Sequence, residues 1–151
     1  MHLQYDDQSL SDILTRVRVI ALVGASPKPQ RDSHRVMAYL QARGYRVIPV
    51  NPHAGCAELL GERVYPSLEA IPTRIKVDMV DVFRRSDEVP EIAEAAIRIG
   101  ARVLWLQLGV IHADAARRAR DYGLQVVMDR CPKIDIPRLG LEQALSLRNE
   151  D

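Results

Sequence analysis

The chain has 151 residues, about one domain at the usual length of roughly 100–200 residues, so a large multidomain enzyme is excluded. Hydrophobic residues make up 47% of the chain and charged residues 27%, which is typical of a compact globule rather than of a disordered or fibrous protein. The 21 Lys and Arg residues nearly balance the 20 Asp and Glu residues, so no overall basic field predicts binding to nucleic acid or to a membrane. A local anion site stays open.

The cysteine content and the amino terminus indicate where the protein works. Cys56 and Cys131 are far apart and form neither a disulfide framework nor a CxxC motif, which favours a reducing compartment. The chain has no apolar run near the roughly 20 residues that cross a bilayer and no basic segment followed by an apolar leader. We therefore expect a cytoplasmic protein.

The first elements alternate between helix and strand. Apolar residues at helical spacing predict a helix over Leu10–Val17. The continuous apolar run Val19–Val23, ending at Gly24, predicts a strand buried on both faces, as in parallel sheets. A polar, proline-containing loop over 25–32 leads to a second helix with Ser33 as its cap.

The middle of the chain predicts shorter elements. Arg46–Val50 is expected to be a strand, and its internal Pro49 suits only a position that needs no ladder donor. A turn then leads to a short third strand over Arg63–Pro66, and Ser67 caps a one-turn helix over Leu68–Ile71.

Alternation continues in the second half. The pattern predicts strands at Val77–Phe83, Arg102–Leu108 and Val126–Met128, with helices from Ser86 to Ile99 and over Ala113–Tyr122. Residues 136–151 are expected to form a tail or a short helix. The whole pattern indicates a single doubly wound α/β domain over 1–151, with a mostly parallel sheet of five to six strands and helices on both faces.

In such sheets, ligands bind at the carboxyl ends of the strands where the winding direction reverses, after the first and fourth predicted strands. Gly24 permits a tight exit from the first strand, and the amide groups around Ala25, Ser26 and Ser33 are predicted to seat a diphosphate at the start of the next helix. The residues expected to bind a cofactor at this edge are Gly24, Ala25, Ser26, Pro27, Lys28, Ser33, Asn51, Pro52, His53, Phe83, Arg84, Arg85, Gln107 and Gly109.

The loop pattern discriminates among nucleotides. The first loop lacks the second and third glycines of GxGxxG, and the second strand ends in Asn51-Pro52 instead of the acidic residue that binds the ribose of NAD. NAD is therefore disfavoured. NADP and coenzyme A (CoA) both carry a ribose phosphate, which Lys28, Arg31 or Arg35 is available to bind.

Three residues at this edge of the sheet each have two possible roles. Arg84 and Arg85 form either a solvated pair or a phosphate fork, and Phe83 either packs in the core or contacts an adenine.

Sequence motifs for other chemistry are missing. The four histidines, His2, His34, His53 and His112, have no metal-ligand spacing, and no GxSxG nucleophile motif occurs. Asp78 and Asp81 lie on a buried strand, where a carboxylate that anchors a loop or the core is favoured over a catalytic pair. Cys131 follows the last strand, between Arg130 and Lys133, and is either a structural or a reactive thiol.

Five stretches in this order resemble CoA-binding domain proteins, the stand-alone relatives of the amino-terminal domain of the succinyl-CoA synthetase alpha subunit. They cover roughly residues 10 to 135 and are Val23-Gly24-Ala25-Ser26, Val50-Asn51-Pro52, Val80 to Arg85, Trp105 to Gly109 and Met128 to Cys131. The resemblance implies a Rossmann-like sheet, with the ADP part of CoA at the first loop, Asn51 to His53 and Phe83 to Arg85. A basic residue is common in such proteins where His53 stands.

The resemblance also implies binding without catalysis, because the synthetases carry their phosphorylated histidine on a further domain. We therefore predict a protein that binds CoA or an acyl-CoA. The alternatives are a small NADP-dependent reductase and a CoA-linked thiol-redox module that uses Cys131. A small nucleotide is the expected partner, with neither nucleic acid nor membrane, and a homo-oligomer or a partner subunit stays open.

Overall fold

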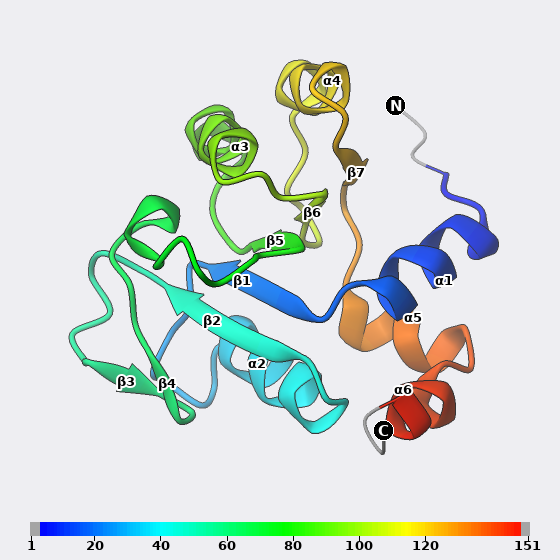
Figure 1. Cartoon of the computed structure of the whole chain (residues 1–151), viewed down its shortest axis with the longest axis horizontal. Helices are drawn as coiled ribbons and strands as arrows, with labels where there is room; N and C mark the ends of the chain where they lie inside the picture. Colours follow the sequence, from blue (N-terminus) through cyan, green and yellow to red (C-terminus); the bar gives the residue numbers. More distant parts are fainter. Residues whose placement is uncertain (1–3, 149–151) are drawn as a thin grey trace.

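The computed structural model describes residues 4–148. In chain order its elements are α1 (Asp7–Arg16), β1 (Val19–Val23), α2 (Asp32–Ala42), β2 (Arg46–Val50), β3 (Glu58–Leu59), β4 (Glu62–Arg63), the 3₁₀ turn η1 (Leu68–Ala70), β5 (Met79–Val82), the 3₁₀ turn η2 (Ser86–Glu88), α3 (Val89–Arg98), β6 (Val103–Leu106), α4 (Ala113–Asp121), β7 (Gln125–Val127), α5 (Pro132–Arg138) and α6 (Glu142–Arg148) (Figure 1).

The main sheet has five parallel strands in the order β2-β1-β5-β6-β7. The chain leaves β1 toward β2 through α2 and leaves β5 toward β6 through α3, so the winding direction reverses between β1 and β5. This confirms the predicted α/β, doubly wound fold, which is Rossmann-like. The assignment of all 151 residues to one domain stays a prediction. Residues 1–3, which include His2, and residues 149–151 lie outside the described residues.

Helices cover both faces of the sheet, as Figure 1 shows. Alternate residues of the strands point to opposite faces. One face packs against alanines of α3 and α4, including Ala93, Ala96 and Ala116. The other packs against α1, α2, α5 and α6, around the fully buried Trp105. The strands are therefore mostly apolar, because helices cover both faces of the sheet.

Pro49 lies in β2, which is an edge strand of the main sheet. Its carbonyl accepts the Tyr65 amide (3.1 Å), and the Asn51 amide donates to the Tyr65 carbonyl (2.9 Å). In a parallel ladder the N and O of one residue point to the same side, so the missing N–H of Pro49 faces this edge, away from β1. The expectation for Pro49 is confirmed.

Three local predictions were wrong. The segment around Arg63 forms a small antiparallel hairpin, β3 with β4, and only Tyr65 pairs with the main sheet, by a single bridge to Val50. Ser33 does not cap α2, since the helix begins at Asp32 and Arg31 occupies the cap position without a side-chain bond. Ser86 does not cap α3, because its hydroxyl instead accepts the Ile111 amide at 3.0 Å.

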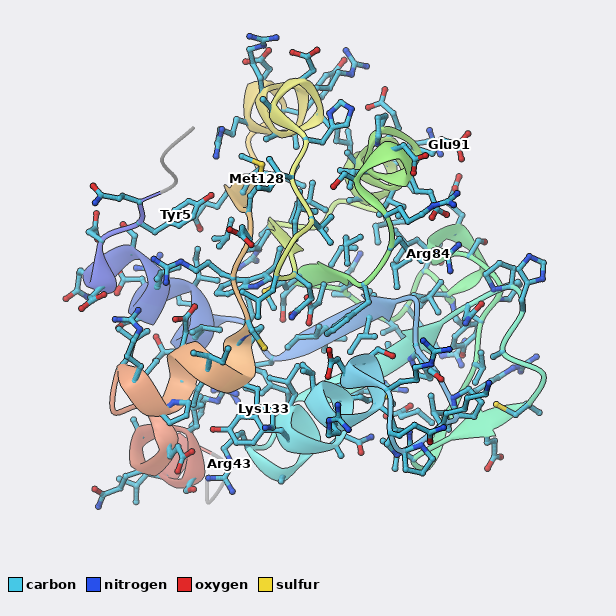
Figure 2. The ribbon with its side chains drawn as sticks, turned by 180° about the vertical axis from the view of Figure 1, so that it is seen from behind. Tyr5, Arg43, Arg84, Glu91, Met128 and Lys133 are labelled. Atoms are coloured by element: carbon cyan, nitrogen blue, oxygen red, sulfur yellow. The ribbon has the colours of Figure 1, made fainter. Side chains whose placement is uncertain are left out.

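The last part of the chain forms two helices. α5 contacts both α1 and α2. The hydroxyl of Tyr5 accepts the amide of Met128 (2.8 Å), which joins the start of the chain to the end of β7 (Figure 2). Asp78 anchors the start of β1, because its carboxylate accepts the amides of Arg18 (2.8 Å) and Val19 (3.0 Å).

Candidate functional site

The site lies at the carboxyl edge of the sheet, where β1 and β5 are neighbours. Gly24 leaves β1 with φ +93°, and the Phe83 amide donates to the Val23 carbonyl at 2.8 Å. A Cβ on Gly24 would lie 2.5 Å from the Phe83 carbonyl oxygen, closer than side chains pack. Glycine is required here by both the backbone conformation and the neighbouring chain.

Contrary to the prediction, not all the amides of the first loop are available to bind a phosphate. The Gly24 and Ala25 amides both donate to the Val50 carbonyl, at 2.9 and 3.4 Å, and Ala25 is buried. Within residues 4–148 no acceptor is found for the amides of Ser26, Asp32 and Ser33. The donors left for an anion are therefore at Ser26 and at the start of α2, where the helix dipole is positive.

A polar cavity of about 670 Å³ opens beside these donors. It brings together nine of the predicted cofactor-binding residues, Gly24, Ser26, Pro27, Lys28, Ser33, Asn51, His53, Phe83 and Arg84. Arg31 and Arg35 also line it, so the cations that we considered for a ribose phosphate lie around one space. Arg35 is ion-paired with Asp32 at 2.7 Å.

Two loops that form the polar cavity are tied to each other. The Asn51 side chain donates from Nδ2 to the Ala25 carbonyl (2.7 Å) and accepts the His53 amide on Oδ1 (2.8 Å). The His34 ring donates from Nδ1 to the Ser26 carbonyl (3.0 Å). Asn51 and His34 therefore position the loops rather than offering free groups to a ligand.

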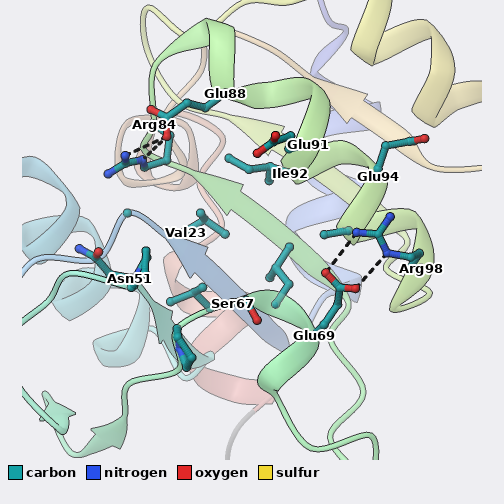
Figure 3. Close-up of a pocket in the computed structure, with 16 residues that line it drawn as sticks. Val23, Asn51, Ser67, Glu69, Arg84, Glu88, Glu91, Ile92, Glu94 and Arg98 are labelled. Carbon is teal, nitrogen blue, oxygen red and sulfur yellow. Dashed lines mark hydrogen bonds and ion pairs between the residues drawn. The ribbon is translucent and has the colours of Figure 1, made fainter.

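An apolar groove of about 580 Å³ lies on the α3 side of the same edge (Figure 3). Its apolar surface comes from β1, β2 and the loop after it, η1 and α3, through Val23, Val50, Pro52, Leu68, Ile92 and Ala95. Four glutamates and Arg98 also line it. Sequence reasoning placed only Gly24, Asn51, Pro52 and Arg84 of the groove residues at the site. The missed signal was the spacing of Glu91, Ile92, Ala95 and Arg98 on one face of a helix.

Arg84 lies at the junction of the polar cavity and the apolar groove, both of which it lines together with Gly24 and Asn51. Its guanidinium donates twice to Oε1 of Glu88, from Nε (3.1 Å) and Nη2 (2.8 Å). These hydrogen bonds lower the pKa of Glu88. Arg85, by contrast, has a side chain 80% exposed with ion-pair distances of 3.5 Å, so it is the more solvated of the two arginines.

The remaining predicted residues lie farther along the edge. Arg85 and Gln107 line another cavity of about 560 Å³. Gly109 donates its amide to the Asp129 carboxylate at 2.7 Å. Cys131 is 7% exposed and lies at the start of α5, where it lines a cavity of about 240 Å³ with Gln107.

No group of three or more His, Cys, Asp or Glu within 4–148 is arranged to hold a metal ion. None of the helices in that range has the length and apolar character that crossing a membrane requires. Asp81 is fully buried, and neither carboxyl oxygen has a hydrogen-bond partner among the described residues.

Comparisons with known proteins show the family and the fold of the chain. The family model of the CoA binding domain matches residues 18–137. The uncharacterized protein YneT of Bacillus subtilis is 40% identical over 125 residues, covering 83% of this chain and 90% of that protein. The solved structure of a hypothetical protein from Pyrococcus horikoshii is 41% identical, with a TM-score of 0.84 over 92% of this chain and 99% of that one.

A more distant relative has a named activity. The alpha subunit of an ADP-forming acetate–CoA ligase I from Pyrococcus furiosus is 28% identical over 130 residues, covering 77% of this chain and 28% of that subunit. The comparisons do not favour the two alternatives, the NADP-dependent reductase and the thiol-redox module. Because the family model spans most of the sheet and its carboxyl edge, the chain belongs to the CoA binding domain family.

Proposed function

We propose that the protein binds CoA or an acyl-CoA and catalyses no reaction of its own. The observation that carries this proposal is the continuity of a polar cavity with an apolar groove across Gly24, Asn51 and Arg84. A nucleotide with several phosphates and a flat apolar base needs two such spaces side by side.

The polar cavity is the proposed seat of the phosphates. The amides of Ser26, Asp32 and Ser33 offer donors at the positive end of α2, and Lys28 and Arg31 add positive charge. Backbone donors and cations together are the usual means of binding phosphate groups. Asp32 lies at the same place, but its carboxylate is neutralised by Arg35.

The apolar groove is the proposed seat of the adenine ring. Three of its glutamates are paired with arginines, and Glu91, which has no such partner among the described residues, disfavours phosphate, so the charges orient the ligand with its base toward α3 and its phosphates toward α2. The pantetheine arm is then expected to leave past Phe83 toward Gln107 and Cys131, which line the cavity of about 240 Å³. The two free cysteines agree with a cytoplasmic location, which is part of the same proposal.

Isothermal titration with CoA, 3′-dephospho-CoA, NAD and NADP tests the proposal. We expect CoA to bind most tightly. We also expect the Lys28→Ala, Arg31→Ala double variant to lose roughly tenfold in CoA affinity and less in 3′-dephospho-CoA affinity, because charge-assisted contacts to the ribose phosphate are removed. Arg117→Ala, on α4, is the matched control and should change neither affinity. Absence of CoA binding at millimolar concentration would contradict the proposal.

A further inference from the structure

We propose that Glu91 determines the base specificity of the apolar groove, by accepting a hydrogen bond from the exocyclic amine of an adenine. This inference rests on the proposed function, since it names the group that reads the base of the bound nucleotide. It concerns a residue outside those that the sequence indicated.

Three of the four glutamates in the groove already have cationic partners. Glu69 accepts two hydrogen bonds from Arg98 (3.0 and 3.1 Å), and Glu88 accepts two from Arg84. Glu94 is held by Arg118 at 2.9 to 3.1 Å. These hydrogen bonds lower the pKa of each of the three carboxyl groups. The charge of each of the three carboxylates is therefore paired within the protein, although Oε2 of Glu88 has no hydrogen-bond partner among the described residues and lies 3.5 Å from Nε of Arg85.

Glu91 differs from the other three glutamates. Within residues 4–148 its carboxylate has no ion pair and no hydrogen-bond partner. Figure 3 shows its side chain beside Ile92, on the part of α3 nearest Val23, whereas the Glu94 side chain points away from Ile92. Among the four groove glutamates, Glu91 is therefore the one whose carboxylate has no cation beside it within the described residues.

This combination defines the chemistry of the occupant. Apolar side chains from β1, β2 and α3 fit the faces of a flat ring, and the Glu91 carboxylate at the border, unpaired within residues 4–148, offers an acceptor to an N–H donor on the ring's edge. A phosphate is repelled by the same carboxylate. A ring that carries an amino group meets both conditions, and adenine carries one.

The test compares CoA with a CoA analogue in which hydrogen replaces the 6-amino group of adenine, by isothermal titration. For the wild-type protein we expect the analogue to bind roughly tenfold more weakly than CoA, because it cannot donate to the Glu91 carboxylate. Glu91→Ala should bring the affinity ratio close to one. Glu91→Gln keeps an acceptor oxygen and should give an intermediate ratio.

Glu94→Ala is the matched control. It also removes a glutamate from the same groove and the same helix, but the carboxylate that it removes is already bound by Arg118. It should keep the wild-type ratio. A wild-type ratio near one, or a ratio unchanged in Glu91→Ala, would overturn the role of Glu91 while leaving CoA binding intact. Failure of the wild-type protein to bind CoA at all would instead overturn the proposed function. Should Glu91→Ala not fold, the wild-type and Glu91→Gln ratios decide the question.

Discussion

Asp81 places a carboxyl group in the middle of the sheet, with Leu22 and Trp105 as its neighbours in the flanking strands. Burial raises its pKa well above the ordinary value, so the folded protein favours the protonated form. In the unfolded chain the group ionises above a pKa of about 3.9. The free energy of unfolding therefore falls as the pH rises from that value toward the folded-state pKa.

We predict that Asp81→Asn removes this pH dependence. The stability advantage of the variant over the wild type should grow by up to about 1.4 kcal/mol for each pH unit between the two pKa values. Urea denaturation of both proteins from pH 4 to 8 measures it. Asp87→Asn serves as the control, because that side chain is 74% exposed. A difference that stays constant with pH for Asp81→Asn would count against the buried neutral acid.

Gly24→Ala is the second prediction at the scale of single residues. A non-glycine residue in a left-handed conformation costs about 1–2 kcal/mol, and the contact with the Phe83 carbonyl adds to that cost. Gly100→Ala isolates the backbone cost, since Gly100 has φ +77° and nothing within 4 Å of its added Cβ. Urea denaturation should show a larger loss for Gly24→Ala, and titration should show weaker CoA binding for this variant alone. Equal losses of stability would contradict the steric argument.

Among the helices, α6 is fastened to the end of α1 by one arginine. Arg148 donates from Nη1 to the carbonyls of Thr15 (2.7 Å) and Val17 (2.9 Å), and its guanidinium lies 4.9 Å from the centre of the Tyr45 ring. The Tyr45 hydroxyl in turn donates to the Leu14 carbonyl. Carbonyls at a helix end otherwise have no partner, so Arg148 stabilises α1 as well as α6.

We therefore predict that Arg148→Ala lowers the free energy of unfolding by roughly 1–2 kcal/mol. Arg117→Ala removes an arginine whose exposed partner is Asp114, one turn away on α4, and should cost less than about 0.5 kcal/mol. Thermal and urea denaturation of the two variants compare these losses directly. If both variants lose the same small amount, α6 is not anchored through this side chain.

For the whole molecule, the sequence predicted the strands of the main sheet better than the cavities at the carboxyl edge of that sheet. The apolar run Val19–Val23 and its four counterparts indicated buried strands because each is covered on both faces, and the alternation with helices implied the reversal of winding beside Gly24. The prediction that cofactor-binding residues lie near that point followed from the topology alone.

The remainder depended on contacts between distant parts of the chain. The orientation of the Ala25 amide is decided by Val50, and the hairpin near Arg63 has too few residues for a periodic signal. Glu91 was missed because it lies within a helix and not at the end of a strand, where ligand-binding residues were expected. Only the packing of α3 beside β1 and η1 makes it part of a groove.

Tyr65 and Pro49 together also affect how the protein behaves at high concentration. An unpaired outer strand can recruit the same strand of another molecule and start aggregation. Here the outer strand β2 lacks the N–H donor of Pro49, and Tyr65 already binds the Pro49 carbonyl and the Asn51 amide. The other outer strand, β7, is only three residues long. Neither border of the sheet is a good template for self-assembly.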